Sequence, residues 1–521
     1  MNHLFKNDDA KRLSPQMFIW GFAAVYSLLT YIFLREKNLS GLDPANYFLA
    51  IKYGFSLAAE RPHAPGYPFF IFLGQQISSL FKVDPHSAII LFNKIFLFLS
   101  IGLCYNFVKK YWSNATAVIA VLLITCNPLV LYYGSVSEIY IYDLFFSIGI
   151  LYLVMACRAK FLPLAFFVIG MSMGFRLSSV VLLAPVIALA VFFREDLKFF
   201  ISFKIITAII LSFLLGICTW LIPFYIFGAG IQSFWQAMHD AGDLDSTMYQ
   251  NAAAYGGYFL WSINILCIVL FIRTGKNDSS TKRKKILLFA WFIIPTLFFL
   301  FEHYAKGYIL LILPSLIIPI ANRISSVENS NVKRWLTAFL VLSNISLFFF
   351  SPFIPLMPES SLLKTQRSST ERMKTAFMRP FSVFAPTFLH IVIADEAIKE
   401  ANSLLEKNCP TQSVILLDNS ATSWAFPRSL EAANPSLFFV QMNSRDTNVV
   451  TLYHESEIDR FYSIQKLLPR DTLYYLIDTR FVNAFGVPPE TKLLSNGSYL
   501  ALYIVTSKEK MLFWKYFTRT K

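Results

Sequence analysis

Residues 39–80 read LSGLDPANYFLAIKYGFSLAAERPHAPGYPFFIFLGQQISSL and lie between two long apolar stretches. Asp43 comes shortly after the first of these stretches, and Pro44 suits the first turn of a helix. The segment NYFLAIKYGFSLA is therefore expected to form an amphipathic helix. Asp43 is either a functional carboxylate or the N-cap of this helix, because Asp is a leading N-cap residue.

The second half of this segment, RPHAPGYPFF, is a turn stiffened by prolines and a glycine. Tyr67-Pro68 opens a further apolar helix. Such a turn would hold His63 and Tyr67 in place near the lipid headgroups. The alternative is a plain turn at the membrane interface.

The chain as a whole is too apolar for an ordinary soluble protein. Of its 521 residues, 55% are hydrophobic and 15% are charged, and the mean hydropathy is +0.52. Soluble proteins carry about 25% charged residues. We therefore expect a polytopic α-helical membrane protein, in which each span needs about 20 mostly apolar residues. About eleven stretches are candidate spans: 16–34, 87–108, 114–133, 139–157, 161–175, 178–193, 204–227, 257–273, 286–301, 305–321 and 335–351.

Lysine and arginine predict the orientation of these spans. If residues 1–15 are cytoplasmic, the inner segments carry 19 Lys and Arg, against 7 in the outer loops before residue 352. This bias follows the positive-inside rule. Two long loops, 35–86 and 228–256, then lie outside, and an odd number of spans places the C-terminus outside. The basic run at 282–285 fits the same topogenic role, so the +14 net charge does not indicate a nucleic-acid partner.

The composition changes after residue 351. Residues 16–351 are expected to form the membrane domain, 352–387 a linker, and 388–521 a small soluble α/β domain on the outer face, because short apolar strands there alternate with helical patterns. That region has no glycine-rich phosphate loop. The six cysteines show no CxxC spacing, so neither a zinc site nor a disulfide framework is predicted.

Ionisable residues gather at the outer ends of the spans, which favours a site at the membrane surface over a channel through its middle. Glu138 is either a second site carboxylate or an acid placed at a helix start. In the loop FEHYAKGY, His303 and Lys306 could bind a phosphate. Ordinary loop solvation and interfacial anchoring are the alternative for this cluster.

Three motifs together resemble a known group of enzymes. They are the turn HAPGYP at 63–68, the element SEIY at 137–140, and the segment YILLILP at 308–314. They are similar to motifs of the GT-C superfamily of membrane glycosyltransferases, above all to its protein O-mannosyltransferase-like members with an H-P-P-G-Y-P turn. Ala64 replaces one proline of that turn. The resemblance covers roughly residues 16–351.

The resemblance implies transfer of a sugar, mannose or another hexose, from a polyprenyl-phosphate carrier to an acceptor hydroxyl on the outer or lumenal face. It implies that Asp43 is the catalytic base and Glu138 a second site carboxylate. The remaining residues would bind substrate: His63 and Tyr67 would line the site, and Arg176, His303, Lys306 and Tyr308 would lie at the carrier. Family members often carry paired acids in the first loop, whereas Pro44 follows Asp43 here, so no metal and no cofactor is predicted.

The sequence leaves two other classes of function open. A transporter or flippase of lipid-linked sugar would carry ionisable residues at mid-membrane. A non-catalytic envelope scaffold would need only the soluble tail. The expected partners are the bilayer, the polyprenyl-phosphate sugar and a protein or glycolipid acceptor, in a bacterial inner membrane or the endoplasmic reticulum. The sequence does not identify the acceptor.

Overall fold

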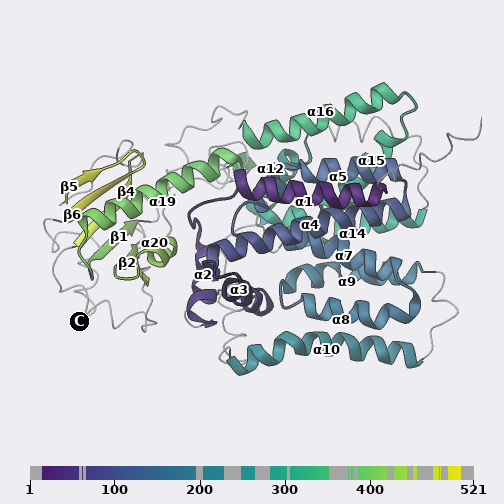
Figure 1. Cartoon of the computed structure of the whole chain (residues 1–521), viewed down its shortest axis with the longest axis horizontal. Helices are drawn as coiled ribbons and strands as arrows, with labels where there is room; N and C mark the ends of the chain where they lie inside the picture. The colour runs from purple at the N-terminus through teal and green to yellow at the C-terminus, as the bar shows by residue number, and fades with distance from the viewer. Residues whose placement is uncertain are drawn as a thin grey trace, which may run out of the picture.

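The apolar runs of the chain form helices that lie side by side along one long axis (Figure 1). Four helices in the described part of the chain are long and apolar enough to cross a membrane: α1 (Pro15–Phe33), α4 (Pro85–Tyr111), α10 (Phe203–Phe227) and α16 (Ser330–Phe349). Shorter helices complete the bundle: α3 (Pro68–Phe81), α5 (Asn114–Thr125), α6 (Pro128–Tyr133), α7 (Ile141–Ala156), α8 (Leu162–Ser172), α9 (Leu177–Phe192), α12 (Met248–Ile263), α14 (Lys282–Phe301) and α15 (Ile309–Ser325).

The computed structural model describes residues 14–57, 61–62, 66–194, 203–227, 248–264, 282–301, 306–350, 373–374, 377–378, 385–418, 427–442, 450–453, 473–479, 482 and 491–505. The N-terminal 13 residues, most of the linker and residues 228–247 of the second outer loop lie outside these ranges. Each predicted span overlaps a helix, which suits a helical membrane protein. The number of eleven spans stays a prediction.

One detail of the predicted spans differs in the structure. The stretch 114–133 is divided into α5, which ends at Thr125, and α6, whose N-cap is Asn127. The Oδ1 of Asn127 accepts from the N–H of Leu129 at 3.0 Å. Pro128 occupies the first helical position of α6, which Pro tolerates well. The predicted stretches 161–175 and 178–193 agree with two short helices, α8 and α9, which are joined by residues 173–176.

Aromatic side chains fill the centre of the bundle. Phe96 of α4 contacts Tyr142 of α7 at 4.7 Å between ring centroids, and Phe175 lies 5.6 Å from the same Phe96 ring. Such edge-to-face and tilted contacts add stability beyond the area that they bury. Phe70 of α3 extends this core, since its ring lies 5.5 Å from Tyr142 and 5.3 Å from Tyr47.

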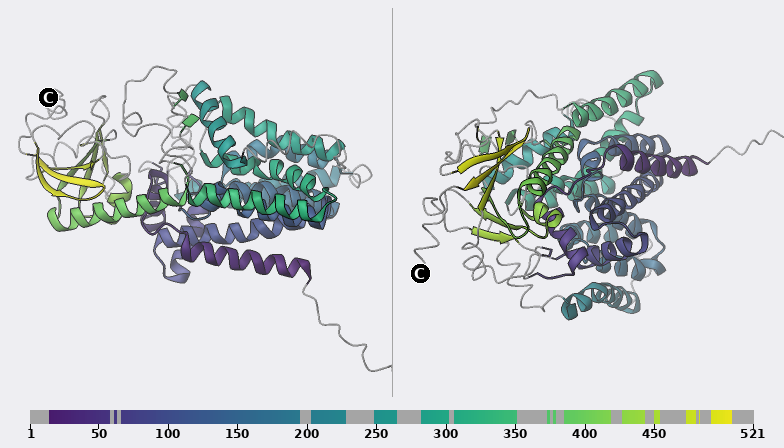
Figure 2. Two further views of the ribbon diagram at one scale, coloured as in Figure 1. Left: turned by 90° about the horizontal axis from the view of Figure 1, so that it is seen from above. Right: turned by 60° about the vertical axis from the view of Figure 1, so that its left-hand side comes forward.

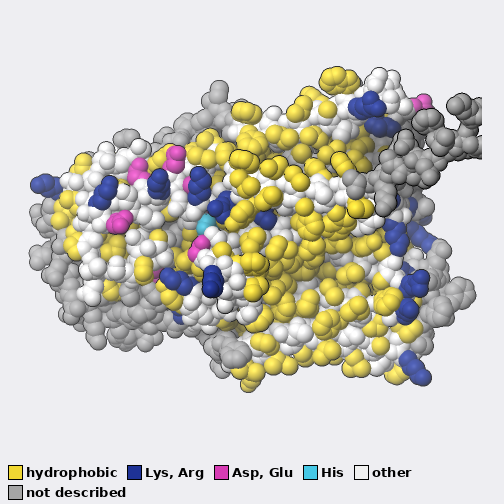
Figure 3. Space-filling model, in the orientation of Figure 1, with side chains coloured by type: hydrophobic (Ala, Val, Ile, Leu, Met, Phe, Trp, Pro, Cys, Tyr) yellow, Lys and Arg dark blue, Asp and Glu magenta, His cyan; other side chains and the backbone are white. Residues whose placement is uncertain are grey.

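Basic side chains mark the end of the bundle opposite the β-sheet (Figure 3). Lys110 at the end of α4 donates to the carbonyl of Ala156 at the end of α7, at 3.0 Å. Lys284 at the start of α14 donates to the carbonyl of Tyr111. Between this end and the sheet, the visible surface is mainly hydrophobic (Figure 3), as expected of a belt in contact with lipid.

Residues 388–505, here called the C-terminal unit, contain a six-stranded mixed sheet. Its order is β3-β2-β1-β4-β6-β5, and β1 is parallel to both β2 and β4, while the other pairs are antiparallel. The strands are β1 (Val414–Asp418), β2 (Phe438–Met442), β3 (Val450–Tyr453), β4 (Leu473–Asp478), β5 (Thr491–Asn496) and β6 (Leu500–Val505). Helices α19 (Phe388–Asn408) and α20 (Pro427–Ala433) accompany this sheet.

Helix α19 extends from the sheet to the end of the bundle (Figures 1 and 2). His390 near its start stacks on Tyr132 of α6, with ring centroids 6.0 Å apart. On the same side of the bundle, helix α2 (Leu42–Tyr53) contacts α20. Helix α2 therefore lies between the other helices of the bundle and the C-terminal unit.

Candidate active site

Asp43 lies in the first turn of α2, one residue inside the helix. The N-cap is Gly41, whose φ of +111° is a conformation that favours glycine, and no side chain makes the capping hydrogen bond. The interpretation of Asp43 as the N-cap is therefore wrong, because the glycine turn starts the helix before Asp43 is reached. A carboxylate at this position is favoured by the N-terminal end of the helix dipole.

Glu138 lies in the turn between α6 and α7, three residues before α7 begins at Ile141. The acid in the first turn of α7 is Asp143, so the helix-start role falls to that residue. Both Asp43 and Glu138 are half-buried.

A group of tyrosines lies near the two carboxylates. Tyr47 of α2 and Tyr140, which precedes α7, each interact electrostatically with both Asp43 and Glu138. Tyr67 and Tyr308 each interact with Asp43. Acids that are far apart in the sequence thus share one aromatic surface, and its hydroxyls can donate or accept hydrogen bonds.

Arg176 forms the buried base of this surface. Its Nε lies 2.8 Å from Oδ1 of Asp143, and the two side chains are only 4% and 2% exposed. The hydroxyl of Ser179 donates to the same carboxylate. The Arg176 guanidinium also lies over the rings of Tyr140 and Tyr308, at 4.6 and 4.9 Å, so a fixed positive charge is held just below the tyrosines.

Tyr67 and Tyr308 are placed by their backbones. Tyr67 has a left-handed φ of 46° directly before Pro68, a conformation that is uncommon for a residue with a side chain. Burial raises the pKa of the Tyr67 phenol well above its ordinary value, although Arg176 opposes this shift. Tyr308 ends the short helix η2 (Lys306–Tyr308). Its neighbour Gly307 lies against Tyr140 so closely that a Cβ would approach the ring to 2.1 Å.

The structure thus brings together five of the eight predicted site residues: Asp43, Tyr67, Glu138, Arg176 and Tyr308. His63 and His303 lie outside the described residues, and only the backbone of Lys306 is described. Among the described side chains, no group of three or more His, Cys, Asp or Glu residues is arranged to hold a metal ion.

Comparison by sequence finds no relative: no family model matches the chain, and no curated protein matches it. Comparison by structure finds proteins of similar fold. ArnT from Cupriavidus metallidurans in the apo state matches with a TM-score of 0.58 at 11% identity, over 94% of this chain and 97% of ArnT. The crystal structure of the same protein bound to undecaprenyl phosphate gives a TM-score of 0.55 at 12% identity, over 94% and 98% of the two chains. The chain shares the fold of ArnT.

At 11–12% identity, the match to ArnT shows the fold alone, a helical bundle like the one that the apolar runs predict. It does not test the protein O-mannosyltransferase-like subfamily. A weaker likeness is found to the apo oligosaccharyltransferase of Archaeoglobus fulgidus, with a TM-score of 0.46 at 12% identity over 91% of this chain and 70% of that one.

Sequence reasoning missed several buried polar residues around the site. Asn93 and Lys94 stand inside the apolar run 87–108, where polar groups are costly, and this contrast could have revealed them. Glu36 and Asp395 gave no such indication, because neither lies in a recognisable motif. Their contacts appear only when distant segments meet in the fold.

Proposed function

We propose that the chain is a glycosyltransferase that moves a sugar from a polyprenyl-phosphate carrier to an acceptor hydroxyl at the outer or lumenal membrane surface. The observation that carries the proposal is the pair of half-buried carboxylates, Asp43 and Glu138, joined by shared tyrosines above the buried Arg176. The fold of ArnT, which has been crystallised with undecaprenyl phosphate, supports the same class of donor.

In the proposed reaction, Asp43 accepts the proton of the acceptor hydroxyl. The hydroxyl oxygen attacks the anomeric carbon of the sugar, the bond from that carbon to the carrier phosphate breaks, and the polyprenyl phosphate departs with the electron pair. A positioned base of this kind contributes typically 10²–10⁴-fold to a rate. Glu138 would orient the sugar or the acceptor from the opposite segment.

The departing phosphate gains negative charge, which pre-positioned donors and cations can stabilise. Arg176 supplies a fixed positive charge, and the hydroxyls of Tyr67 and Tyr308 lie within electrostatic reach of it. His63, His303 and Lys306 are proposed to complete the phosphate site from the neighbouring loops. The proposed sugar is mannose or another hexose, and the proposed acceptor is a protein or a glycolipid.

A flippase or transporter is less well supported by the described contacts. Its best candidate for a charge within the membrane is Lys94, but this ammonium is buried and donates to the hydroxyl of Ser135 at 3.3 Å. A lysine engaged in holding a turn has a structural explanation and does not call for a transport path.

The test is transfer by the full chain in lipid nanodiscs. Undecaprenyl-phosphate mannose, glucose and galactose, each with a labelled sugar, are offered with a membrane lipid extract and with Ser/Thr-containing peptides. We expect transfer from at least one donor, and a loss of roughly 10²–10⁴-fold in kcat for Asp43→Asn. The exposed Glu328, in the loop between α15 and α16, gives the charge-matched control Glu328→Gln. Undiminished activity of Asp43→Asn would refute the assigned role, and donor flux without sugar transfer would favour a flippase.

A further inference from the structure

The segment that leads to Asp43 is held at several points. Residues 34–41, here called the entry segment, connect α1 to α2. The N–H of Glu36 donates to the carbonyl of Ser135 at 2.9 Å. Ser135 belongs to the Glu138 turn, defined as residues 134–140. The entry segment, which leads to Asp43, and the turn that carries Glu138 are therefore bonded to each other through their backbones.

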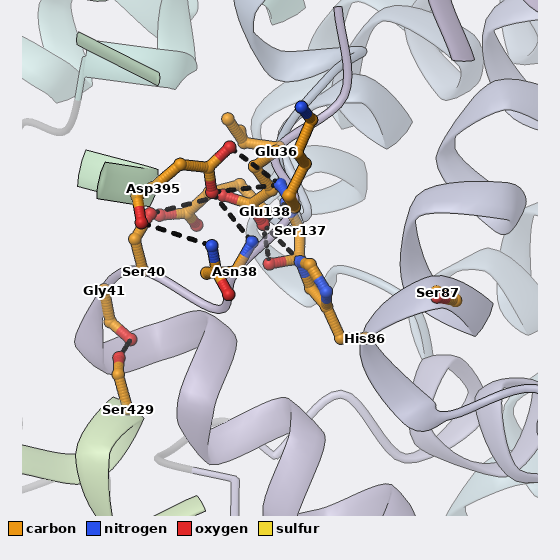
Figure 4. Close-up of polar contacts among 12 residues, drawn as sticks. Glu36, Asn38, Ser40, Gly41, His86, Ser87, Ser137, Glu138, Asp395 and Ser429 are labelled. Atoms are coloured by element: carbon orange, nitrogen blue, oxygen red, sulfur yellow. Dashed lines mark hydrogen bonds and ion pairs between the residues drawn. The ribbon is translucent and has the colours of Figure 1, made fainter. Parts of the chain in front are cut away.

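The carboxylate of Glu36 strengthens this connection (Figure 4). Its Oε1 accepts from the N–H of Ser137 at 2.7 Å, from the Ser137 hydroxyl, and from Nε2 of His86 at 3.0 Å. The side chain of Glu36 is 2% exposed. One buried oxygen thus joins the entry segment, the residue directly before Glu138, and the start of α4.

Helix α4 holds the Glu138 turn from its other side. The Nδ2 of Asn93 donates to the carbonyls of Val136 and Glu138, both at 2.8 Å. The Oδ1 of Asn93 accepts from the hydroxyl of Tyr142, also at 2.8 Å. These buried contacts fix the turn to a membrane helix, so Glu36 binds a turn that is already rigid.

The C-terminal unit holds the entry segment from outside the bundle (Figure 4). The Asp395 carboxylate of α19 accepts from the N–H of Lys37 at 2.9 Å and from the N–H of Asn38 at 2.7 Å. The side chain of Asn38 donates back to the carbonyl of Asp395 at 3.2 Å. In α20, the hydroxyl of Ser429 donates to the carbonyl of Gly41, the N-cap of α2, at 3.1 Å.

We propose that Glu36 and Asp395 are positioning residues that fix the separation of Asp43 and Glu138, and that the C-terminal unit is thereby part of the working site. This inference rests on the proposed transferase function. Glu36 sets the entry segment against the Glu138 turn, and Asp395 prevents the same segment from moving away from it. Neither residue contacts the substrates.

The proposed reaction gives a reason for holding the entry segment in place. Reacting groups must meet within a few tenths of an ångström, and a displacement of 1 Å can lower a rate about 10²-fold. Asp43 lies on a segment that follows a glycine with positive φ, and such a turn does not by itself hold one conformation. Glu36 binds the Glu138 turn from one side of the entry segment, and Asp395 binds the segment's N–H groups from the other. Together these contacts restrain the segment that precedes Asp43.

The experiment compares Asp395→Ala with Glu406→Ala in the full chain in nanodiscs. Glu406 is an exposed acid on the same helix, so its replacement makes the same change in charge. Three quantities are measured: hydrogen–deuterium exchange of the peptides covering 34–43, the melting temperature, and kcat and KM with undecaprenyl-phosphate mannose or whichever tested donor the wild type uses. Glu36→Gln, which keeps the shape and removes the charge, is the second variant.

We expect faster exchange in residues 34–43 and a fall of about 10- to 100-fold in kcat for Asp395→Ala, with KM for the donor and the melting temperature little changed. Glu406→Ala should match the wild type in every measurement. A variant that exchanges faster but turns over normally would overturn the positioning role, as would unchanged exchange in both Asp395→Ala and Glu36→Gln. Failure of the transferase proposal is distinguishable, because it would appear as absent transfer in the wild type.

Discussion

Replacing Asp143 with asparagine should destabilise the protein, because it leaves the Arg176 guanidinium as a buried charge without a counter-ion. The two side chains are 4% and 2% exposed, and Nε lies 2.8 Å from Oδ1. Removing one partner of a pair buried to this degree costs about 3–5 kcal/mol. Asparagine keeps an oxygen at nearly the same place, so the loss measures the charge rather than a cavity.

The assay is reversible unfolding of the detergent-solubilised protein by sodium dodecyl sulfate, followed by circular dichroism. Ser179→Ala is the control, because it removes one hydrogen bond to the same carboxylate and should cost less, about 1.5–3 kcal/mol. The double variant Asp143→Leu with Arg176→Met replaces the whole pair by apolar groups. It should recover most of the stability and remain inactive, since the fixed positive charge is gone.

Two results would refute this reasoning. A free energy of unfolding for Asp143→Asn within about 1 kcal/mol of the wild type would mean that the charge of Arg176 is already compensated by other groups. Full sugar transfer by the double variant would mean that Arg176 does not stabilise the departing phosphate.

Two further outcomes follow from the site and its surroundings. Gly307→Ala should lower kcat about tenfold or more, because its Cβ would lie 2.1 Å from the ring of Tyr140, whereas Gly21→Ala on α1 meets nothing within 4 Å and should leave turnover unchanged. Burial raises the pKa of Asp395, with the N–H groups of Asn38 and Lys37 opposing, so the ionised form costs stability at neutral pH. The melting temperature of the wild type should therefore rise relative to that of Asp395→Asn as the pH falls through the raised pKa toward about 3.9, the ordinary Asp value. A difference in melting temperature that does not change with pH would contradict this.

The helices could be predicted because their information is local. An apolar run of about 20 residues forms a helix in lipid whatever its neighbours are, since only internal hydrogen bonds can satisfy its backbone. The break at Asn127 escaped this reasoning, because hydropathy averaged over the run 114–133 hides one polar residue followed by a proline. The start of α2 was misjudged for a similar reason, because a positive φ at Gly41 cannot be read from composition.

The candidate site was predictable in part. Asp43, Tyr67 and Glu138 stand out because polar or rigid residues at the ends of apolar runs are unusual. Glu36 and Asp395 do not stand out, because each is one acid among the polar residues of its segment. The Asp395–Lys37 contact joins residues 358 positions apart, and no local pattern determines which distant segment an acid will meet.

The contacts of Asp395 with the entry segment also have a consequence for biosynthesis. The chain is made from its N-terminus, so α1 and Asp43 leave the ribosome long before Asp395 exists. A nascent chain can therefore insert its helices while the acid that would deprotonate an acceptor is still loosely placed. If the proposed positioning role holds, the site reaches its final geometry only when the last quarter of the chain has folded. A protein truncated before that point would then occupy the membrane with its two carboxylates poorly placed.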